Sequence, residues 1–283
     1  MNHKVSAIYK ESVLLLTPIY GEREAESILN LLFEDHLGIT RIHRLTNPEK
    51  ELSESNVEKL QTAMPQLLKN VPVQHIIGFA YFMDRKYLVN KHTLIPRPET
   101  EELAGLILDE NDHEKALDML DIGTGTGCIA ISLALGFSQA KVTGWDISER
   151  AVEIARQNSQ ALGTSVIFEV QDVLREVPSK KYDLIVSNPP YIPETDRADM
   201  HENVVGFEPE GALFVPNDDP LIFYRRIANL GSTHLNPGGK LYFEIHEDFG
   251  QAMKEMLQEK GYQQVGVFQD LNGKDRMVRA LLI

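Results

Sequence analysis

The sequence has almost no cysteine, no long apolar run and few basic residues for its length. The single cysteine, Cys128, excludes an intramolecular disulfide and is typical of a reducing cytoplasm. No stretch approaches the roughly 18 uninterrupted apolar residues that a membrane span requires. The first residues, MNHKVSAIYKESVLLL, contain only a short apolar run and no small-residue cleavage site, so we expect neither a signal peptide nor an anchor. These features predict a cytoplasmic protein that does not contact a membrane.

Basic residues are outnumbered, with 28 Lys and Arg against 42 Asp and Glu and a formal net charge of −14. Proteins that wrap nucleic acid neutralise its phosphates with Lys and Arg, so we expect no direct nucleic-acid binding. The charge suits a basic macromolecular partner, because complementary fields steer encounter. It suits equally a protein whose charge only keeps it in solution, so the balance alone does not identify a partner.

The 283 residues are enough for two domains. Apolar residues recur at helical spacing in residues 1–72, for example Leu29, Leu32 and Phe33, and predict a small helical domain. Residues 73–96 form a linker in which Phe79–Met83 and Tyr87–Val89 predict a β-hairpin. Residues 97–283 make up the third segment.

Strands and helices alternate in this third segment. The expected strands are apolar runs, and they are Leu117–Ile122, Lys141–Trp145, Val166–Val170, Tyr182–Ser187 and Lys240–Ile245. Helical patterns at Ile129–Leu135 and Glu149–Leu162 separate the earlier runs, and a helix can begin at Glu99. A final pair, Gln263–Phe268 and Met277–Ile283, predicts a terminal hairpin. The alternation predicts an α/β domain with a mainly parallel sheet covered by helices.

A glycine-rich loop, Asp121-Ile-Gly123-Thr124-Gly125-Thr126-Gly127, follows the first of these strands. Glycines allow a sharp turn and the close approach of a ligand to the backbone. The loop lies at the carboxyl edge of the strands, where such sheets bind ligands. Gly125-x-Gly127-x-x-Ala130 also fits a dinucleotide fingerprint, and a purely structural turn is a further alternative. The acid two residues before the first glycine and the G-x-G-x-G spacing favour S-adenosylmethionine over NAD.

Two acids follow the next two strands. Asp146 ends the second strand, where a carboxylate can accept hydrogen bonds from both ribose hydroxyls. It could instead cap the next helix, a task that Ser148 could share. Asp172 and Val173 follow the third strand and are candidates for the adenine, although Asp172 could be an ordinary loop acid.

The sequence Asn188-Pro189-Pro190-Tyr191 comes directly after the fourth strand. An amide nitrogen is a poor nucleophile, so a site that methylates it must orient the NH₂ group and stabilise the charge that develops on nitrogen. The side-chain oxygen of Asn188 and the carbonyl of Pro189 could each accept one N–H. The prolines have no competing N–H and make the turn rigid, and Tyr191 can lie over the planar group. The alternative is a purely structural role, in which the segment is only a turn that ends the strand.

The histidines and the cysteine show no sequence pattern of a metal site or of a catalytic nucleophile. His201, His234 and His246 lack metal-ligand spacing, so we expect no metal. Cys128 has no basic activating neighbour in the sequence and is interpreted as a helix-packing residue.

With these motifs the chain resembles the PrmC/HemK family of bacterial protein-(glutamine-N5) methyltransferases. The resemblance runs from about Pro72 to the C-terminus. It is carried by 72–78 (PVQHIIG), 94–101 (LIPRPETE), 121–127, 188–191, 207–213 (FEPEGAL) and Asp275-Arg276. The segment 94–101 is the most specific, because Asn-Pro-Pro-Tyr is shared with adenine amino-methyltransferases. His75 and His246 depart from the family pattern.

The resemblance implies a Rossmann-like class I methyltransferase domain with a seven-stranded sheet, behind a helical domain that docks a peptide chain release factor. It implies as substrate the glutamine of a Gly-Gly-Gln loop. Gly123 to Gly127, Asp146, Val173 and Asn188 would contact the cofactor, and Asn188 to Tyr191 the glutamine. We expect a monomer.

Three other functions are compatible with parts of the sequence. An N6-adenine or other nucleobase methyltransferase would need a recognition domain or a basic groove, for which the chain has neither length nor charge. A cofactor-binding module without catalysis would not need the segment 188–191. An NAD-dependent reductase would be expected to carry a hydride-transfer acid such as a Tyr-x-x-x-Lys pair, which is not found.

Overall fold

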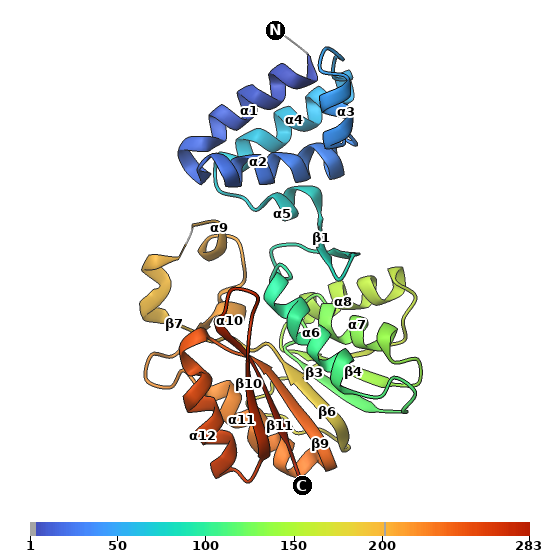
Figure 1. The fold of residues 1–283 in the computed structure, drawn as a ribbon, viewed down its shortest axis with the longest axis vertical. Coiled ribbons are helices and arrows are strands. Elements are labelled where there is room, and N and C mark those ends of the chain that lie inside the picture. Colours follow the sequence, from blue (N-terminus) through green and yellow to red (C-terminus); the bar gives the residue numbers. More distant parts are fainter. Residues whose placement is uncertain (1–3, 201) are drawn as a thin grey trace. The chain divides into compact units, whose positions relative to one another are not determined.

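The structure is a computed structural model that describes residues 4–200 and 202–283. Residues 1–3, where the predicted helical domain begins, and His201 lie outside the described residues. The chain divides into two compact units, one made of residues 1–79 and 201–207 and the other of residues 80–200 and 208–283. Figure 1 shows the course of the chain through both units.

The first unit is helical. Its elements are α1 (Val5–Tyr20), α2 (Glu22–Leu31), a π-helical turn (Leu32–His36), α3 (Arg41–Thr46), α4 (Glu54–Leu67), α5 (Val73–Ile77) and α9 (Glu202–Val205). Glu22 and Glu24 lie in the first turn of α2, where negative charge is favourable. Leu29, Leu32 and Phe33 are fully buried, as their spacing predicts.

The second unit begins within a two-stranded hairpin of β1 (Phe79–Phe82) and β2 (Arg85–Leu88). Met83 and Asp84 between them have φ of 48° and 60°, which is the left-handed conformation that a tight hairpin turn requires. The hairpin expected in this part of the chain is therefore present. The start of the same segment is helical instead, because Val73–Ile77 forms α5 and ends at Gly78 with a positive φ.

A seven-stranded sheet forms the centre of the second unit. Its strands are β3 (Asp118–Ile122), β4 (Lys141–Asp146), β5 (Ile167–Val170), β6 (Tyr182–Ser187), β9 (Leu235–Glu244), β10 (Gln263–Gln269) and β11 (Asp275–Leu281). Their order is β10-β11-β9-β6-β3-β4-β5. The strands from β9 to β5 are parallel, whereas β11 pairs antiparallel with both of its neighbours. The predicted α/β architecture with a mainly parallel sheet is confirmed.

Helices cover both faces of this sheet (Figure 1). One layer holds α6 (Pro98–Glu110), α7 (Cys128–Gly136) and α8 (Glu149–Ala161), and the other holds α11 (Ile222–His234) and α12 (Gly250–Glu259). Alternate residues of one strand face opposite layers: Leu184 packs in the first core and Ile185 in the second. Both faces are therefore apolar, which explains the near-continuous apolar runs in the sequence.

Smaller elements lie between β6 and α11. They are β7 (Ile192–Pro193), a 3₁₀ helix (Glu194–Asp199), α10 (Glu210–Leu213) and β8 (Phe214–Val215), and a second 3₁₀ turn (Glu247–Phe249) follows β9. The two short strands β7 and β8 pair in parallel. Within residues 4–200 and 202–283, no helix is both long and apolar enough to cross a bilayer. The same residues contain no cluster of three or more acidic, histidine or cysteine side chains suited to a metal.

Candidate active site

A cavity of about 460 Å³ opens at the carboxyl ends of β3, β4 and β6, in the second unit. This is the edge of an α/β sheet at which ligands bind, and the volume suits a small molecule. Its lining includes most of the residues that the sequence singles out, namely Gly123, Gly125, Asp146, Asp172, Val173, Asn188, Pro189 and Pro190. Thr124, Thr126, Gly127 and Tyr191 are not among the lining residues.

The glycine loop connects β3 to α7. Gly123, Gly125 and Gly127 have φ of 77°, 55° and 80°, a conformation that L side chains rarely adopt. A Cβ at Gly127 would also lie only 3.0 Å from Ile131 and Phe168, so this glycine is required for packing as well. Thr124 and Thr126 are buried. The two threonines therefore shape the loop, whereas Gly123 and Gly125 line the cavity.

Asp121, near the end of β3, holds the glycine loop in place through hydrogen bonds. Its Oδ2 accepts hydrogen bonds from Thr124 Oγ1 at 2.6 Å and from the Ala130 N–H at 3.2 Å. Its Oδ1 is buried without a partner among the described residues. Burial raises the pKa of Asp121 to about 7. Asp121 does not line the cavity, so its contribution is to hold the loop in place.

Asp146 connects the loop to β4. Its Oδ2 accepts from the Gly125 N–H and its Oδ1 from the Ser148 N–H, each at 2.9 Å. Burial raises the pKa of Asp146, and these two backbone donors oppose that shift. Ser148 caps α8 by accepting from the Ala151 N–H, so the helix does not need Asp146 as its cap. Each oxygen of Asp146 keeps a lone pair for a hydroxyl in the cavity.

The second acid of the cavity follows β5. Asp172 Oδ1 accepts from the Leu174 N–H at 2.9 Å, and Oδ2 lies 3.3 Å from Arg175 Nε. The carbonyl of Val173 accepts from Arg226 Nε at 2.8 Å. These contacts hold a short loop against the cavity beside Asp146.

Asn188 is held by a chain of hydrogen bonds that begins behind the cavity. Its Nδ2 donates to Thr100 Oγ1 at 3.1 Å, and the Thr100 hydroxyl donates to Glu244 Oε2 at 2.6 Å. Because the only hydroxyl hydrogen of Thr100 is used on Glu244, Thr100 must accept from Asn188. The Asn188 oxygen receives no hydrogen bond from the described part of the chain. It is therefore available as an acceptor at the cavity.

Tyr191 lies on the other side of the same carboxylate. Its hydroxyl donates to Glu244 Oε1 at 3.3 Å, and its ring packs edge-on to His246 with centroids 6.1 Å apart. Burial raises the pKa of Tyr191 far above its usual range. The tyrosine thus supports Glu244 and does not itself line the cavity.

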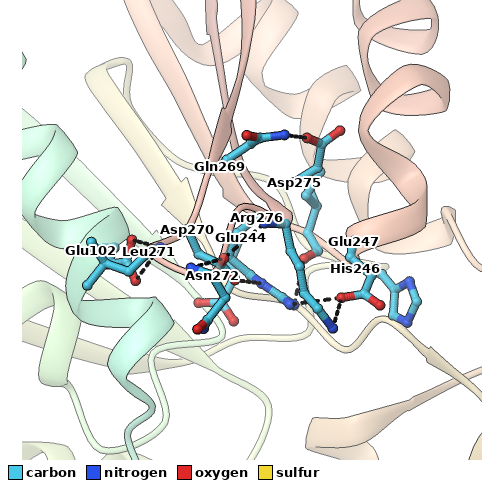
Figure 2. Close-up of polar contacts among 12 residues, drawn as sticks. Glu102, Glu244, His246, Glu247, Gln269, Asp270, Leu271, Asn272, Asp275 and Arg276 are labelled. Carbon is cyan, nitrogen blue, oxygen red and sulfur yellow. Dashed lines mark hydrogen bonds and ion pairs between the residues drawn. The ribbon is translucent and has the colours of Figure 1, made fainter.

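The charge of Arg276, from β11, lowers the pKa of Glu244, and Figure 2 shows the polar contacts that hold Arg276. Its Nε lies 3.4 Å from Asp270 Oδ2, and its Nη1 donates to the Ile245 carbonyl at 3.3 Å. Nη2 lies 3.7 Å from Glu247 Oε2. Burial raises the pKa of Glu244 to about 7, and the Thr100 hydrogen bond and Arg276 act against this rise.

Thr100 and Glu244 are functional candidates to which the sequence reasoning assigned no role. Thr100 lies in the family segment 94–101 and Glu244 in the expected strand Lys240–Ile245. Their contact spans 144 positions of the chain, so neither segment alone predicts it. One signal was available, because Glu244 is a charged residue at the end of an otherwise apolar strand. A buried carboxylate with a raised pKa near a cavity is a candidate for a functional residue.

The seven-stranded sheet, the glycine loop and the cavity at the strand ends define a class I S-adenosylmethionine-dependent methyltransferase. Two solved structures share this fold. A methyltransferase from Pyrococcus furiosus matches with a TM-score of 0.50 and 18% identity, over 81% of this chain and 98% of its own. The 16S rRNA N2 G1207 methyltransferase of Thermus thermophilus, in complex with AdoMet and guanosine, matches with a TM-score of 0.53 and 16% identity, over 72% and 50%.

Sequence comparisons identify the family. Residues 11–78 match the PrmC N-terminal domain, and residues 102–206 match the methyltransferase small domain. The release factor glutamine methyltransferase of Bacteroides thetaiotaomicron is 45% identical over 98% of this chain and 99% of its own. That of Flavobacterium psychrophilum is 37% identical over 94% and 95%. The chain belongs to the release factor glutamine methyltransferase family, as the resemblance in its motifs predicts.

Proposed function

We propose that the protein transfers the methyl group of S-adenosylmethionine to the side-chain amide nitrogen, N5, of the glutamine in the Gly-Gly-Gln loop of a peptide chain release factor. The observation that carries the proposal is the orientation of Asn188. Its amide oxygen is the free end of a hydrogen-bonded chain and lies at the cavity. The family of the chain supports a protein glutamine over a nucleobase as the acceptor.

The residues of the cavity fit the methyl donor, which supplies an electrophilic methyl group on a positively charged sulfur. The backbone of Gly123 to Gly127 gives close access, and the carboxylate of Asp146, which lines the cavity, would balance positive charge. Asp146 would accept from the ribose hydroxyls through its remaining lone pairs. Asp172 and Val173 would hold the adenine.

The acceptor side is formed by Asn188 and the residues after it. The Asn188 oxygen and the Pro189 carbonyl would each accept one N–H of the glutamine amide, which aligns the nitrogen and stabilises its developing positive charge. Pro190 has no N–H to compete, and its ring keeps the turn rigid. Tyr191, which does not line the cavity of this structure, would contact the planar amide once the glutamine is bound, and it donates a hydrogen bond to Glu244.

The partner and the setting follow from this substrate. Residues 1–72 would form the domain that docks the release factor, residues 73–96 the linker, and residues 97–283 the catalytic domain. The enzyme would act in the cytoplasm as a monomer, without binding nucleic acid or a membrane. The charge of −14 would speed encounter with a basic surface of the release factor.

The test is a labelling experiment with a methyl-labelled donor and a panel of purified release factors, tRNA, rRNA and DNA. We expect label only in release factors, and none when the glutamine of the Gly-Gly-Gln loop is replaced by alanine. Asn188→Ala enzyme is the matched control for contaminating activity. Label in a nucleic acid, or equal label in the glutamine-less release factor, would refute the proposal.

A further inference from the structure

The hydrogen-bonded chain from Asn188 ends at a carboxylate that cannot touch the substrate. Glu244 is 1% exposed and does not line the cavity, and Thr100 connects it to Asn188, which does. We propose that Glu244, acting through Thr100, is a positioning residue that fixes the Asn188 amide with its oxygen toward the glutamine. The inference deepens the proposed function and rests on it for its consequence in catalysis.

A carboxylate is needed because an asparagine amide has nearly the same shape in two orientations. The Thr100 hydroxyl has one hydrogen, which it can give either to Glu244 or to Asn188. While Glu244 is ionised it only accepts, and a hydrogen bond to an ionised group is about twice as strong as one between neutral groups. The Thr100 hydrogen therefore stays on Glu244, and Asn188 has to donate its NH₂ to Thr100.

The reverse direction would disable the site. If the group at position 244 donates to Thr100, the hydroxyl can turn its hydrogen to the Asn188 oxygen. Asn188 then presents its NH₂ to the cavity, where the glutamine also presents an NH₂. Two donors facing each other cannot hydrogen-bond, and the acceptor that stabilises the developing charge is lost.

The surroundings of Glu244 make its charge sensitive to pH. Burial is the main influence and raises the pKa of its carboxyl to about 7, and nearby Glu99 adds to the rise. Thr100, Arg276 and Tyr191 favour the ionised form. Tyr224 faces the same residue from α11 and donates to its backbone carbonyl at 3.0 Å, and the Cys128 thiol lies within electrostatic range. The hydrogen bonds that run from Asn188 through Thr100 to Glu244 should therefore reverse their donor–acceptor direction near neutral pH.

Three variants separate this role from simple packing. Glu244→Gln keeps the size of the side chain but supplies an NH₂ donor, and Thr100→Val keeps the shape but removes the hydroxyl. We expect each to lower the single-turnover methylation rate by about 10²-fold, the cost of losing one preorganised contact. Thr100→Ser should restore most of the rate. The affinity for S-adenosylmethionine should not change in any of the three.

The matched control is Glu110→Gln at the other end of α6. Glu110 also accepts a hydrogen bond from a tyrosine hydroxyl, that of Tyr242 at 2.9 Å, and it pairs with Arg279. Ten residues of helix place it about 15 Å from Thr100. This change should leave the rate unaltered.

The decisive readout is the pH profile of kcat/KM, which reports the free enzyme. In the wild type kcat/KM should rise with a midpoint near the Glu244 pKa of about 7. Asp121, whose pKa is also raised to about 7, is present in both enzymes, so the rise in Glu244→Gln should be smaller than in the wild type by the part that Glu244 contributes. A second readout needs no activity. The ¹⁵N signal of the Asn188 side-chain NH₂, assigned by its loss in Asn188→Ala, should titrate over the same range in the wild type and not in Glu244→Gln.

An Asn188 signal that ignores pH, or a Glu244→Gln enzyme with the wild-type rate and profile, would overturn the inference while leaving the proposed function intact. A wild-type enzyme that labels no release factor would instead refute the proposed function. The NMR titration would then still decide whether Glu244 sets the orientation of Asn188.

Discussion

Arg97 donates from Nη2 to both carboxylate oxygens of Glu208, each at 2.8 Å, across 111 positions of the chain. The Glu208 side chain is 1% exposed and that of Arg97 35%. Burial raises the pKa of Glu208, and Arg97 counteracts the rise. The pair fixes the segment that carries Pro209, Gly211 and Ala212, which line the cavity, to the residue that precedes α6.

Arg97→Ala should therefore destabilise the protein, because it leaves the buried Glu208 carboxylate without a partner. Removing one member of a buried pair costs about 3–5 kcal/mol, and the partial exposure of Arg97 favours the lower end of that range. The control is Arg197→Ala. Arg197 is equally exposed at 33%, but its partners Glu194 and Glu210 are themselves 47% and 66% exposed. Its loss should cost much less than that of Arg97, because water replaces it around partners that are already exposed. Urea unfolding measures both, and equal costs would contradict the role given to Glu208.

Asp146→Asn should weaken binding of S-adenosylmethionine. The carboxylate accepts from Gly125 and Ser148, and an amide turns an NH₂ toward one of these donors. We expect a loss of about 1–3 kcal/mol in binding free energy, measured by calorimetry. Asp118→Asn serves as the control, because Asp118 begins β3 at the opposite end of the strand and pairs with Lys180. An unchanged affinity in Asp146→Asn would refute the assignment of Asp146 to the ribose.

Two substitutions at Asn188 separate its acceptor from its donor. Asn188→Ala removes both and should slow single-turnover methyl transfer by about 10²–10³-fold. Asn188→Asp keeps an acceptor for the glutamine but cannot donate to Thr100. Its rate should fall between those of the alanine variant and the wild type. Rates are compared at saturating donor and release factor, and an alanine variant as fast as wild type would remove Asn188 from the mechanism.

Glu244→Gln should stabilise the protein at alkaline pH while it impairs methyl transfer. The folded-state pKa of Glu244 is raised from 4.5 to about 7. Between these values the folded chain holds a proton that the unfolded chain releases, so wild-type stability falls as pH rises. Glutamine does not ionise, and the pKa of Asp121 affects both proteins alike.

The free energy of unfolding of Glu244→Gln minus that of the wild type should therefore increase by about 1.4 kcal/mol for each unit that the pH rises within this window. Denaturant titrations at several pH values from about 5 to about 8 measure the difference. A difference that is constant with pH would show that Glu244 does not titrate in this range.

Much of the fold was predictable because each central strand is buried on both faces and leaves an apolar run of its own length. The start of β9 was not, since Leu235 pairs with Tyr182 ahead of Pro237-Gly238-Gly239, a sequence typical of a turn. The pairing of Ile192 with Phe214 also left no signal, because two-residue strands have no periodicity. Val73–Ile77 is one turn of helix with too few residues to show a helical repeat.

The candidate site likewise has features that the sequence predicts and features that it does not. Gly123 and Asn188 each follow a strand directly and Asp146 ends one, and the carboxyl ends of parallel strands meet at one edge of the sheet. Their convergence could be predicted from order alone. The contacts of Asn188 with Thr100 and of Thr100 with Glu244 depend on how α6 packs beside β6 and β9. Local sequence contains no information on that packing.

The central claim is that the methyl group is transferred to the amide nitrogen of a glutamine side chain. Its most direct test is acid hydrolysis of release factor labelled by this enzyme with a methyl-labelled donor. Hydrolysis of an N-methylated amide returns glutamate and releases the label as volatile methylamine. We predict that the label is recovered as methylamine and that the glutamine-to-alanine release factor yields none. Label that stays in a non-volatile amino acid, or that leaves as methanol in mild base, would contradict the account.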